Sequence, residues 1–420
     1  MRQPNTVVVL SDYGCVNGGG AQVTLASVRG LLAVGLRVVL IYGVGPLDCQ
    51  IDSNHPNLEL HDLKLYDLRG DPSKIRSAAL GVWKPRASRA IGEILKTLDP
   101  VTTVVHLHSW VQSLTASIVP EITRRGFPLV CTLHDYFAVC PNGGLYDYQK
   151  AMICEVKPMG VGCLLTHCDS ASYGEKLWRY ARSTVQGMIG GIPRLISDYI
   201  VVSDFSASVM KSHFPGHANF HLVNNPINIE QGLPSECASH ADFTFVGRLS
   251  PEKGSVLFAQ AARHEHIQSV FVGAGSEEET IRHANPKALL CGWIDRNSVI
   301  ERLRSSRCLV FPSLWYETQG LVVLEAAALG IPSIVSDGCA ARDFVVDGVT
   351  GLIFRGGDLN DLRQKLRSLR DDDACAARLG RNAYARYWDS PYTIEKHINS
   401  LLRVYGGMLG KLAMVQTACT

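Results

Sequence analysis

The stretch Phe311-Pro-Ser-Leu-Trp-Tyr-Glu-Thr-Gln-Gly-Leu-Val-Val-Leu-Glu325 joins an apolar strand to an apolar helix through a polar loop. The run from Cys308 to Phe311 predicts the strand, and helical spacing of apolar residues predicts a helix from Gly320 to Leu329. Glu317 then falls in the loop and Glu325 within the helix. Because carboxylates are seldom buried without a partner or a function, both are candidate site residues.

The same strand-to-helix unit recurs on both sides of this stretch, which predicts an α/β fold. Apolar strands without alternation indicate parallel sheets that helices cover on both faces. In the second half the predicted strands are 243–246, 269–272, 308–311 and 333–335. In the first half the predicted strands are 6–10, 38–42, 101–107, 128–133 and 199–202, and the predicted helices are 21–34, 73–98 and 113–125.

The length predicts two domains, because a single hydrophobic core stops growing near ~250 to 300 residues and this chain has 420. Asn224-Asn225-Pro226-Ile227 and the polar residues that follow are typical of a connector. The expected parts are a Rossmann-like domain over 1–225 with an insertion over 136–197, a second Rossmann-like domain over 226–390, and a helix within 391–420 that crosses back to the first domain.

Composition argues against two broad classes of function. With 46% hydrophobic and 19% charged residues, the chain has enough apolar side chains for packed cores and is not a disordered protein. A formal net charge of +2 lacks the basic excess that a duplex-binding surface needs, so no nucleic acid partner is expected. A small uncharged or anionic ligand fits this balance better.

Hydropathy predicts a cytoplasmic protein, since no apolar run approaches the ~20 residues of a membrane span. The run Val7-Val-Val-Leu10 is also far shorter than a signal-peptide core. Two segments rich in Lys and Arg, 69–96 and 176–194, make peripheral contact with the inner face of the membrane a further hypothesis. Ordinary surface amphipathicity explains 176–194 at least as well.

Two glycine loops in the second half are candidates for binding a phosphate. The first follows a predicted strand and precedes a helix, so Arg248 and Lys253 fall at the carboxyl edge of a parallel sheet. Together these cations suit a diphosphate, with ordinary surface charges on a turn as the alternative. In the second loop, Gly273 and Gly275 would let the backbone approach the same ligand closely.

Three further features suit a nucleotide. Trp293 offers a flat apolar wall for a base, although core packing next to a helix cap at Asp295 explains this segment too. The amides of Gly320 and Leu321 would point from the helix start toward a phosphate. Glu325 could accept hydrogen bonds from ribose hydroxyls. A glycosidase pair is disfavoured, because an eight-residue helical offset spans roughly 12 Å and retaining hydrolases need about 5 to 5.5 Å.

These segments together resemble glycosyltransferase family 4, whose members have the GT-B fold of two facing Rossmann-like domains with the active site in the cleft. The resemblance covers nearly the whole chain. It rests on motifs in the family's order, namely Gly247-Arg-Leu with Lys253, Val272-Gly-Ala-Gly275, Glu317-x7-Glu325 and Asp347-Gly-Val-Thr-Gly351.

The resemblance implies a nucleotide diphosphate sugar as substrate, retention of anomeric configuration, and neither a cofactor nor a metal at the donor. Basic side chains and helix ends would replace the metal at the leaving diphosphate. The implied roles are diphosphate binding by Arg248 and Lys253, ribose binding by Glu325, contact with the transferred sugar by Glu317 and His134, and an acceptor or phosphate loop at Gly18, Gly19 and Gly20. His134 stands in Thr132-Leu-His-Asp-Tyr136.

Two groups of metal-ligating side chains are less specific. The insertion contains four cysteines that suit a structural zinc ion, with buried free thiols as the alternative: Cys140, Cys154, Cys163 and Cys168. His106 and His108 end a predicted strand with both imidazoles on one face. For this pair, an acceptor-site or packing role is favoured over a metal.

Two rival functions remain open. A sugar-nucleotide epimerase has the same fold, but the Glu317-x7-Glu325 pattern favours transfer. A non-catalytic relative that binds sugar nucleotides is the other rival, and the presence of Arg248, Lys253 and His134 argues against it. A lipid-linked sugar or a growing surface polysaccharide is the acceptor hypothesis that fits the basic segments.

Overall fold

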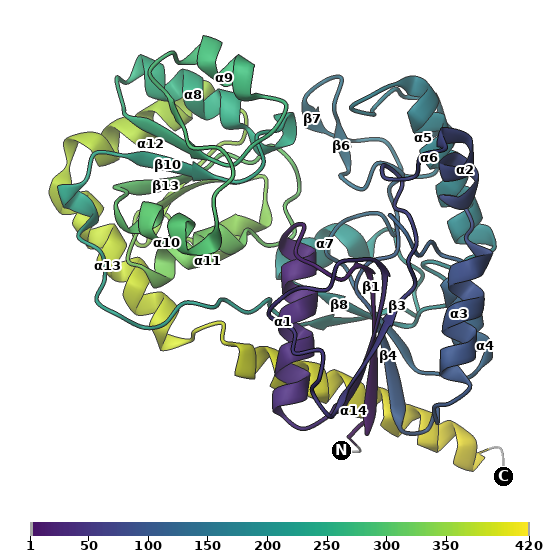
Figure 1. The fold of residues 1–420 in the computed structure, drawn as a ribbon. Helices are drawn as coiled ribbons and strands as arrows, with labels where there is room; N and C mark the ends of the chain where they lie inside the picture. Colours follow the sequence, from purple (N-terminus) through teal and green to yellow (C-terminus); the bar gives the residue numbers. More distant parts are fainter. Residues whose placement is uncertain (1–2, 419–420) are drawn as a thin grey trace.

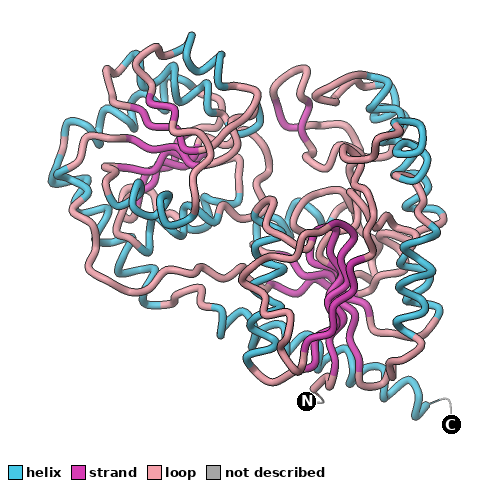
Figure 2. The backbone as a smooth tube through the Cα atoms, viewed as in Figure 1, coloured by secondary structure: helices cyan, strands magenta, loops and turns pink. Residues whose placement is uncertain are grey.

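The computed structural model describes residues 3–418 as two α/β domains joined by a connector, with a long C-terminal helix that returns to the first domain (Figure 1). In each domain the strands lie together and helices surround them (Figure 2). The first sheet ends at Leu222 and the second begins at Phe243, so the boundary placed at residue 225 falls between them. The expected fold class is confirmed.

The first sheet has seven strands, all paired in parallel, in the order β3-β2-β1-β4-β5-β8-β9. They are β1 (Thr6–Tyr13), β2 (Arg37–Val44), β3 (Leu58–Asp62), β4 (Thr103–Leu107), β5 (Leu129–Thr132), β8 (Asp198–Val201) and β9 (Asn219–Leu222). The edge strands β3 and β9 were not predicted, because their half-exposed positions carry polar residues that break the apolar run. The strand order reverses between β1 and β4, which opens a crevice at the carboxyl edge of the sheet.

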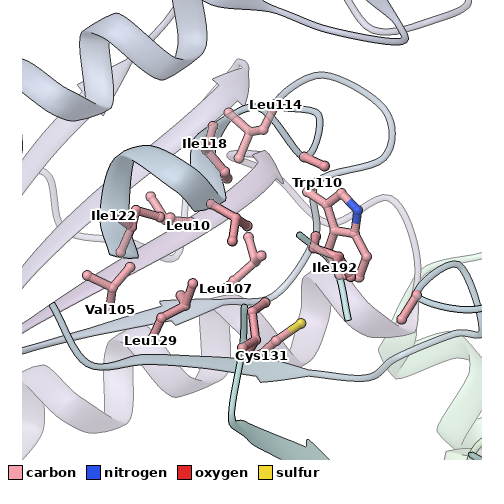
Figure 3. Close-up of a cluster of buried hydrophobic side chains, with 14 of the residues drawn as sticks. Leu10, Val105, Leu107, Trp110, Leu114, Ile118, Ile122, Leu129, Cys131 and Ile192 are labelled. Carbon is pink, nitrogen blue, oxygen red and sulfur yellow. The ribbon is translucent and has the colours of Figure 1, made fainter. Parts of the chain in front are cut away.

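Helices α1 (Gly19–Ala33), α4 (Ile118–Arg124) and α7 (Asp204–Lys211) pack around this sheet. Figure 3 shows Leu10, Leu107 and Leu129 from three strands packing with Ile118 and Ile122 of α4, and all five are at most 6% exposed. This apolar contact anchors the strand ends that border the crevice.

The single helix predicted over 73–98 is wrong, because the structure has α2 (Lys74–Leu80) and α3 (Pro85–Leu95) there. Pro85 lacks an N–H and favours the first position of a helix, so a new helix starts at this residue. The helix predicted from 113 starts only at Ile118, because the amides of Ser113 and Leu114 donate to the Asp12 carboxylate instead, at 2.8 and 3.0 Å.

The insertion contains the short antiparallel hairpin of β6 (Tyr146–Asp147) and β7 (Met152–Ile153), followed by α5 (Val161–Leu165) and α6 (Tyr173–Met188). The hairpin lies on the side of the first domain that faces the second (Figure 1). A Cβ added to Gly144 would lie 3.4 Å from Trp315, so the insertion reaches the second domain.

The second sheet has six parallel strands in the order β12-β11-β10-β13-β14-β15. They are β10 (Phe243–Val246), β11 (Ser269–Val272), β12 (Leu289–Leu290), β13 (Cys308–Phe311), β14 (Ser333–Ser336) and β15 (Gly351–Phe354). The helices are α8 (Ser255–His264), α9 (Glu278–Ala284), α10 (Arg296–Arg304), α11 (Leu321–Ala328), α12 (Leu359–Asp371) and α13 (Asp373–Asp389). Here the order reverses between β10 and β13.

Helix α14 (Ile394–Ala418) crosses back and packs on α1 of the first domain, as Figure 1 shows. The two helices meet closely, since a Cβ added to Gly30 would lie 2.5 Å from Ile398. His397 bonds Ser27 of α1 and the carbonyl of Asn224 in the connector, each at 2.8 Å. Within residues 3–418 no helix has the length and apolar character to cross a membrane.

Candidate functional site

Direct contacts join loops that follow strands of the two sheets. Thr318, in the loop after β13, donates its hydroxyl to the carbonyl of His134, which follows β5, at 3.2 Å. A Cβ added to Gly19 would lie 3.9 Å from Leu321 at the start of α11. Both domains therefore contribute predicted site residues to one region between them.

A partly buried ion pair joins the loops after β10 and β13, where the strand order of the second sheet reverses. The Nζ atom of Lys253 lies 2.6 Å from Oε2 of Glu317, and the two side chains are only 16% and 15% exposed. The indole of Trp315 donates to the same oxygen at 2.9 Å, and the Ser313 hydroxyl donates at 3.3 Å. The ammonium also lies 5.0 Å from the centre of the Trp315 ring.

These contacts keep Glu317 ionised. Burial alone would raise the pKa of its carboxyl, but Lys253 and the hydrogen bonds from Trp315 and Ser313 outweigh burial and lower that pKa. The site therefore holds a fixed carboxylate directly beside a cation.

Arg248 is the more accessible of the two predicted cations. Its guanidinium is 67% exposed and lies 3.6 Å from Oε1 of Glu252, which is itself buried and accepts a bond from Ser250 at 2.7 Å. Because this contact is long, most of the planar guanidinium fork stays available to an anion.

Glu325 has a cationic partner that the sequence did not predict. An Nη atom of Arg296, at the start of α10, lies 2.9 Å from Oε1 of Glu325 on α11. Burial raises the pKa of the Glu325 carboxyl, and Arg296 offsets this effect only in part. One feature of the sequence could have indicated such a partner, because a carboxylate on an apolar helix, such as Glu325, needs a nearby cation when the helix is buried.

Helix α11 begins next to Glu317 with its N-terminus toward the cleft. Its cap residue Gly320 has a φ of 87°, and an added Cβ would lie 3.0 Å from the Cβ of Ala341. A larger residue would be strained there, so glycine lets the helix start close to the loop. The amides of Gly320 and Leu321 lie where an anion is favoured.

His134 packs against the glycine loop of the first domain. A Cβ added to Gly20 would lie 3.2 Å from Cγ of His134. The Nε2 atom of this imidazole is 3.1 Å from Nδ1 of His108, at the end of β4. Both imidazoles line a cavity of about 230 Å³ together with Gly18 and Gly20.

Two acids at this cavity were not predicted. Asp12 is buried and holds the loop after β4 through bonds from the amides of Gln112, Ser113 and Leu114 at 2.8 to 3.0 Å. Burial raises the pKa of Asp135 to about 6. Asp12 lies two residues after the end of the predicted strand 6–10, and this position near a strand end was the available signal.

Three predicted residues of the second domain have less direct roles. Cβ atoms added to Gly273 and Gly275 would lie 2.0 and 2.1 Å from the carbonyls of Gly247 and Leu249. Glycine is therefore required there for packing between the two loops, before any ligand is considered. Trp293 is 80% exposed, so the indole is not part of the core and leaves a free aromatic face.

The structure gives no support to the structural zinc site. No group of three or more His, Cys, Asp or Glu side chains within residues 3–418 is arranged to hold a metal ion. The side chain of Asn142 bonds the thiols of both Cys140 and Cys168, at 3.1 and 3.6 Å. Burial raises the pKa of these thiols to about 11 and about 12, so they are neutral at pH 7.

Comparisons with known proteins agree with this geometry. Sucrose-phosphate synthase from Thermosynechococcus elongatus has the same fold, with a TM-score of 0.71 at 18% identity, covering 99% of this chain and 100% of that one. The sequence profile "Glycosyl transferases group 1" matches residues 239–386. The fold is therefore that of a GT-B glycosyltransferase.

Two relatives extend the match. The D-inositol 3-phosphate glycosyltransferase of Xylanimonas cellulosilytica is 33% identical over 330 residues, which span 75% of this chain and 72% of the relative. The UDP-Gal:alpha-D-GlcNAc-diphosphoundecaprenol alpha-1,3-galactosyltransferase of Escherichia coli is 33% identical over 144 residues, which span 31% of this chain but only 36% of the relative's length. The chain belongs to the group 1 glycosyltransferases.

The Glu325–Arg296 pair predicts a pH-dependent loss of stability on replacing Arg296 by Met. Without the cation, burial would raise the pKa of Glu325 in the folded state further above its value in the unfolded chain. A carboxyl shifted upward destabilises the fold as the pH rises above the unfolded pKa, so the loss should be larger at pH 8 than at pH 5. Each unit of added shift corresponds to about 1.4 kcal/mol.

Thermal unfolding of the parent and of Arg296→Met at both pH values measures this difference. Arg282→Met is the matched control, since Arg282 is exposed on α9 and has no ion pair among the described residues. Equal destabilisation by Arg296→Met at pH 5 and pH 8 would show that Glu325 does not depend on Arg296.

Proposed function

We propose that this protein is a retaining glycosyltransferase that moves a sugar from a nucleotide diphosphate donor to a glycan or lipid-linked acceptor. The observation that carries the proposal is the partly buried Lys253–Glu317 pair, with 2.6 Å between Nζ and Oε2, in the region that also holds His134. This pair places a cation for a diphosphate beside a carboxylate for sugar hydroxyls. Membership of the group 1 glycosyltransferases supports the proposal.

The donor diphosphate lies against Lys253, Arg248 and the start of α11. An ammonium group has three N–H donors, so Lys253 keeps its bond to Glu317 and still offers two to phosphate oxygens. The exposed fork of Arg248 binds the same group in a bidentate manner. These cations and helix amides supply the positive charge, so the proposed donor site needs no divalent metal.

The nucleoside extends toward α10 and α11. Glu325 accepts hydrogen bonds from the ribose hydroxyls, while Arg296 fixes the orientation of its carboxylate. The exposed face of Trp293 is available for stacking against the base.

The reaction breaks the bond between C1 of the sugar and the diphosphate oxygen. The acceptor hydroxyl forms its bond to C1 on the same face, which retains the anomeric configuration. Its proton passes to the leaving diphosphate oxygen, so charge and atoms balance without a base from the protein. Glu317 and His134 hold the sugar so that the two oxygens stand close to C1.

The proposed acceptor is a lipid-linked sugar, and the insertion offers a surface for reaching it. Apolar side chains on α5 and α2 are unusually exposed: Val161 at 74%, Leu165 at 70% and Ile75 at 86%. Lys74 and Lys157 are exposed nearby in the sequence. Apolar and basic groups together suit the inner face of a membrane that contains anionic lipids, in a protein we place in the cytoplasm.

Donor binding tests the proposed site directly. Titration with UDP-sugars and GDP-sugars in the absence of divalent metal should identify one nucleotide that binds. Lys253→Ala and Glu325→Ala should each weaken that binding by at least about tenfold, since each removes a charge-assisted bond of about 1.5 to 3 kcal/mol. Calorimetry or fluorescence titration provides the measurement.

Lys287→Ala is the matched control. Lys287 is exposed and precedes β12, so it lies at the amino edge of the second sheet, opposite the carboxyl edge of the proposed donor site. This variant should bind the sugar nucleotide with the affinity of the parent. Failure of every sugar nucleotide to bind the parent would refute the donor site.

Retention is tested on the product. With the bound donor and a diphospholipid-linked monosaccharide as acceptor, the H1–H2 coupling of the new glycoside in NMR should match the anomer of the donor. A product of opposite configuration would contradict the same-face mechanism. Release of an epimerised sugar nucleotide without transfer would instead point to an epimerase.

Sedimentation with vesicles tests the membrane surface. The parent should bind vesicles that contain phosphatidylglycerol better than pure phosphatidylcholine, and added salt should weaken this preference. The double variant Val161→Asp/Leu165→Asp should lose most of the bound fraction. Leu233→Asp, at an exposed connector residue, should bind as the parent does. Equal sedimentation of the double variant and the parent would exclude this surface.

A further inference from the structure

Three imidazoles form a row inside the first domain, from the C-terminal helix to the cleft. His106 lies in β4, and its ring centre is 3.9 Å from that of His108. The rings of His108 and His134 are stacked at 5.4 Å, with their planes 18° apart. The proposed reaction uses His134 alone, and it gives no role to His108.

The first imidazole is rigidly fixed. The Nδ1 atom of His106 bonds the hydroxyl of Tyr405 on α14, and its Nε2 atom bonds that of Thr132 on β5, each at 2.7 Å. Because both ring nitrogens have partners, His106 forms a fixed wall against which His108 packs. The crossing helix therefore contributes to the position of His108.

His108 has one partnered and one unpartnered nitrogen. Its Nδ1 atom lies 3.1 Å from Nε2 of His134. Its Nε2 atom is buried and has no hydrogen-bond partner among the described residues, although the residue lines the cavity of about 230 Å³. A buried polar atom without a partner is unfavourable, so Nε2 has an unused hydrogen-bonding capacity in a residue that lines this cavity.

The hydrogen bond between the two imidazoles couples their tautomers. Burial lowers the pKa of His134 to about 4 and that of His108 well below its usual value, so both rings are neutral. A neutral imidazole has one N–H and one lone pair. Whichever nitrogen of His108 carries the proton therefore decides which nitrogen of His134 carries its own.

We propose that His108 is a positioning residue that sets the tautomer of His134, and that a substrate hydroxyl in the neighbouring cavity selects this tautomer through Nε2 of His108. The inference rests on the proposed glycosyl transfer, because it identifies the group beside His134 that responds to the acceptor.

Two arrangements conserve every proton. When the hydroxyl oxygen accepts from Nε2–H of His108, Nδ1 of His108 accepts from Nε2–H of His134, and Nδ1 of His134 keeps a lone pair. When the hydroxyl donates instead, Nδ1–H of His108 donates to Nε2 of His134, and Nδ1 of His134 carries the hydrogen. The hydroxyl group in the cavity thus determines whether Nδ1 of His134 offers the sugar a hydrogen-bond acceptor or a donor.

Two substitutions separate the two nitrogens of His108. Asn places its amide near Nδ1, so His108→Asn keeps the bond to His134 and loses the group in the cavity. Gln places its amide near Nε2, so His108→Gln keeps the group in the cavity and loses the bond. Thermal unfolding of both variants checks that they remain folded, and His264→Asn on the exposed end of α8 is the control.

Side-chain 15N NMR reads the tautomer of His134 with and without the diphospholipid-linked acceptor, with the signals assigned through His134→Gln. Binding of the acceptor should shift the tautomer populations of His134 in the parent and should leave them unchanged in His108→Asn and His108→Gln. Unchanged His134 signals in the acceptor-bound parent, or the same shift in His108→Gln, would overturn the proposal. A parent that binds the acceptor but transfers no sugar would refute only the proposed function.

Kinetics with the diphospholipid-linked acceptor supply the second readout. His108→Gln should lower kcat by about 10- to 100-fold, a typical loss when the partner that orients a functional imidazole is removed. His108→Asn should instead act mainly on the KM for the acceptor. The same change of kcat and KM in both variants would overturn the proposal.

Discussion

The arrangement of this site depends on one partly buried ion pair, Lys253 with Glu317. The two side chains are 16% and 15% exposed, and Trp315 and Ser313 satisfy the carboxylate along with the lysine. The pair ties the loop after β10 to the loop after β13 at the point where the strand order reverses. A cation and a carboxylate are consequently fixed between these loops before any ligand arrives.

The first domain meets this charged region mainly through hydrogen bonds that involve the backbone. Thr318, next to Glu317, bonds the carbonyl of His134, and the Ser203 hydroxyl donates to the carbonyl of Thr318 at 2.6 Å. The amide of Phe205 donates to the carboxylate of Asp343 at 3.1 Å. The bond from Thr318 also places His134 within the same loop environment as the Glu317 carboxylate.

The sequence predicted the inner strands well, because strands that are buried on both faces appear as continuous apolar runs. Of the predicted site residues, the structure brings Lys253, Glu317 and His134 to one region between the domains, and their roles there stay predictions. The sequence analysis missed Arg296, because the contact between α10 and α11 depends on the packing angle of two helices and not on spacing within either. For the cysteines of the insertion the sequence left zinc and buried free thiols as alternatives, and the structure favours free thiols, because Asn142 bonds both Cys140 and Cys168.

The crossing helix connects the stability of the first domain with the chemistry of the cleft. Tyr405 is completely buried and bonds His106, while His397 on the same helix bonds both α1 and the connector. The same helix therefore ties α1, the connector and the first imidazole of the row together. Because protein interiors are close-packed, the bond between Tyr405 and His106 constrains the rings of His108 and His134 that follow in the row.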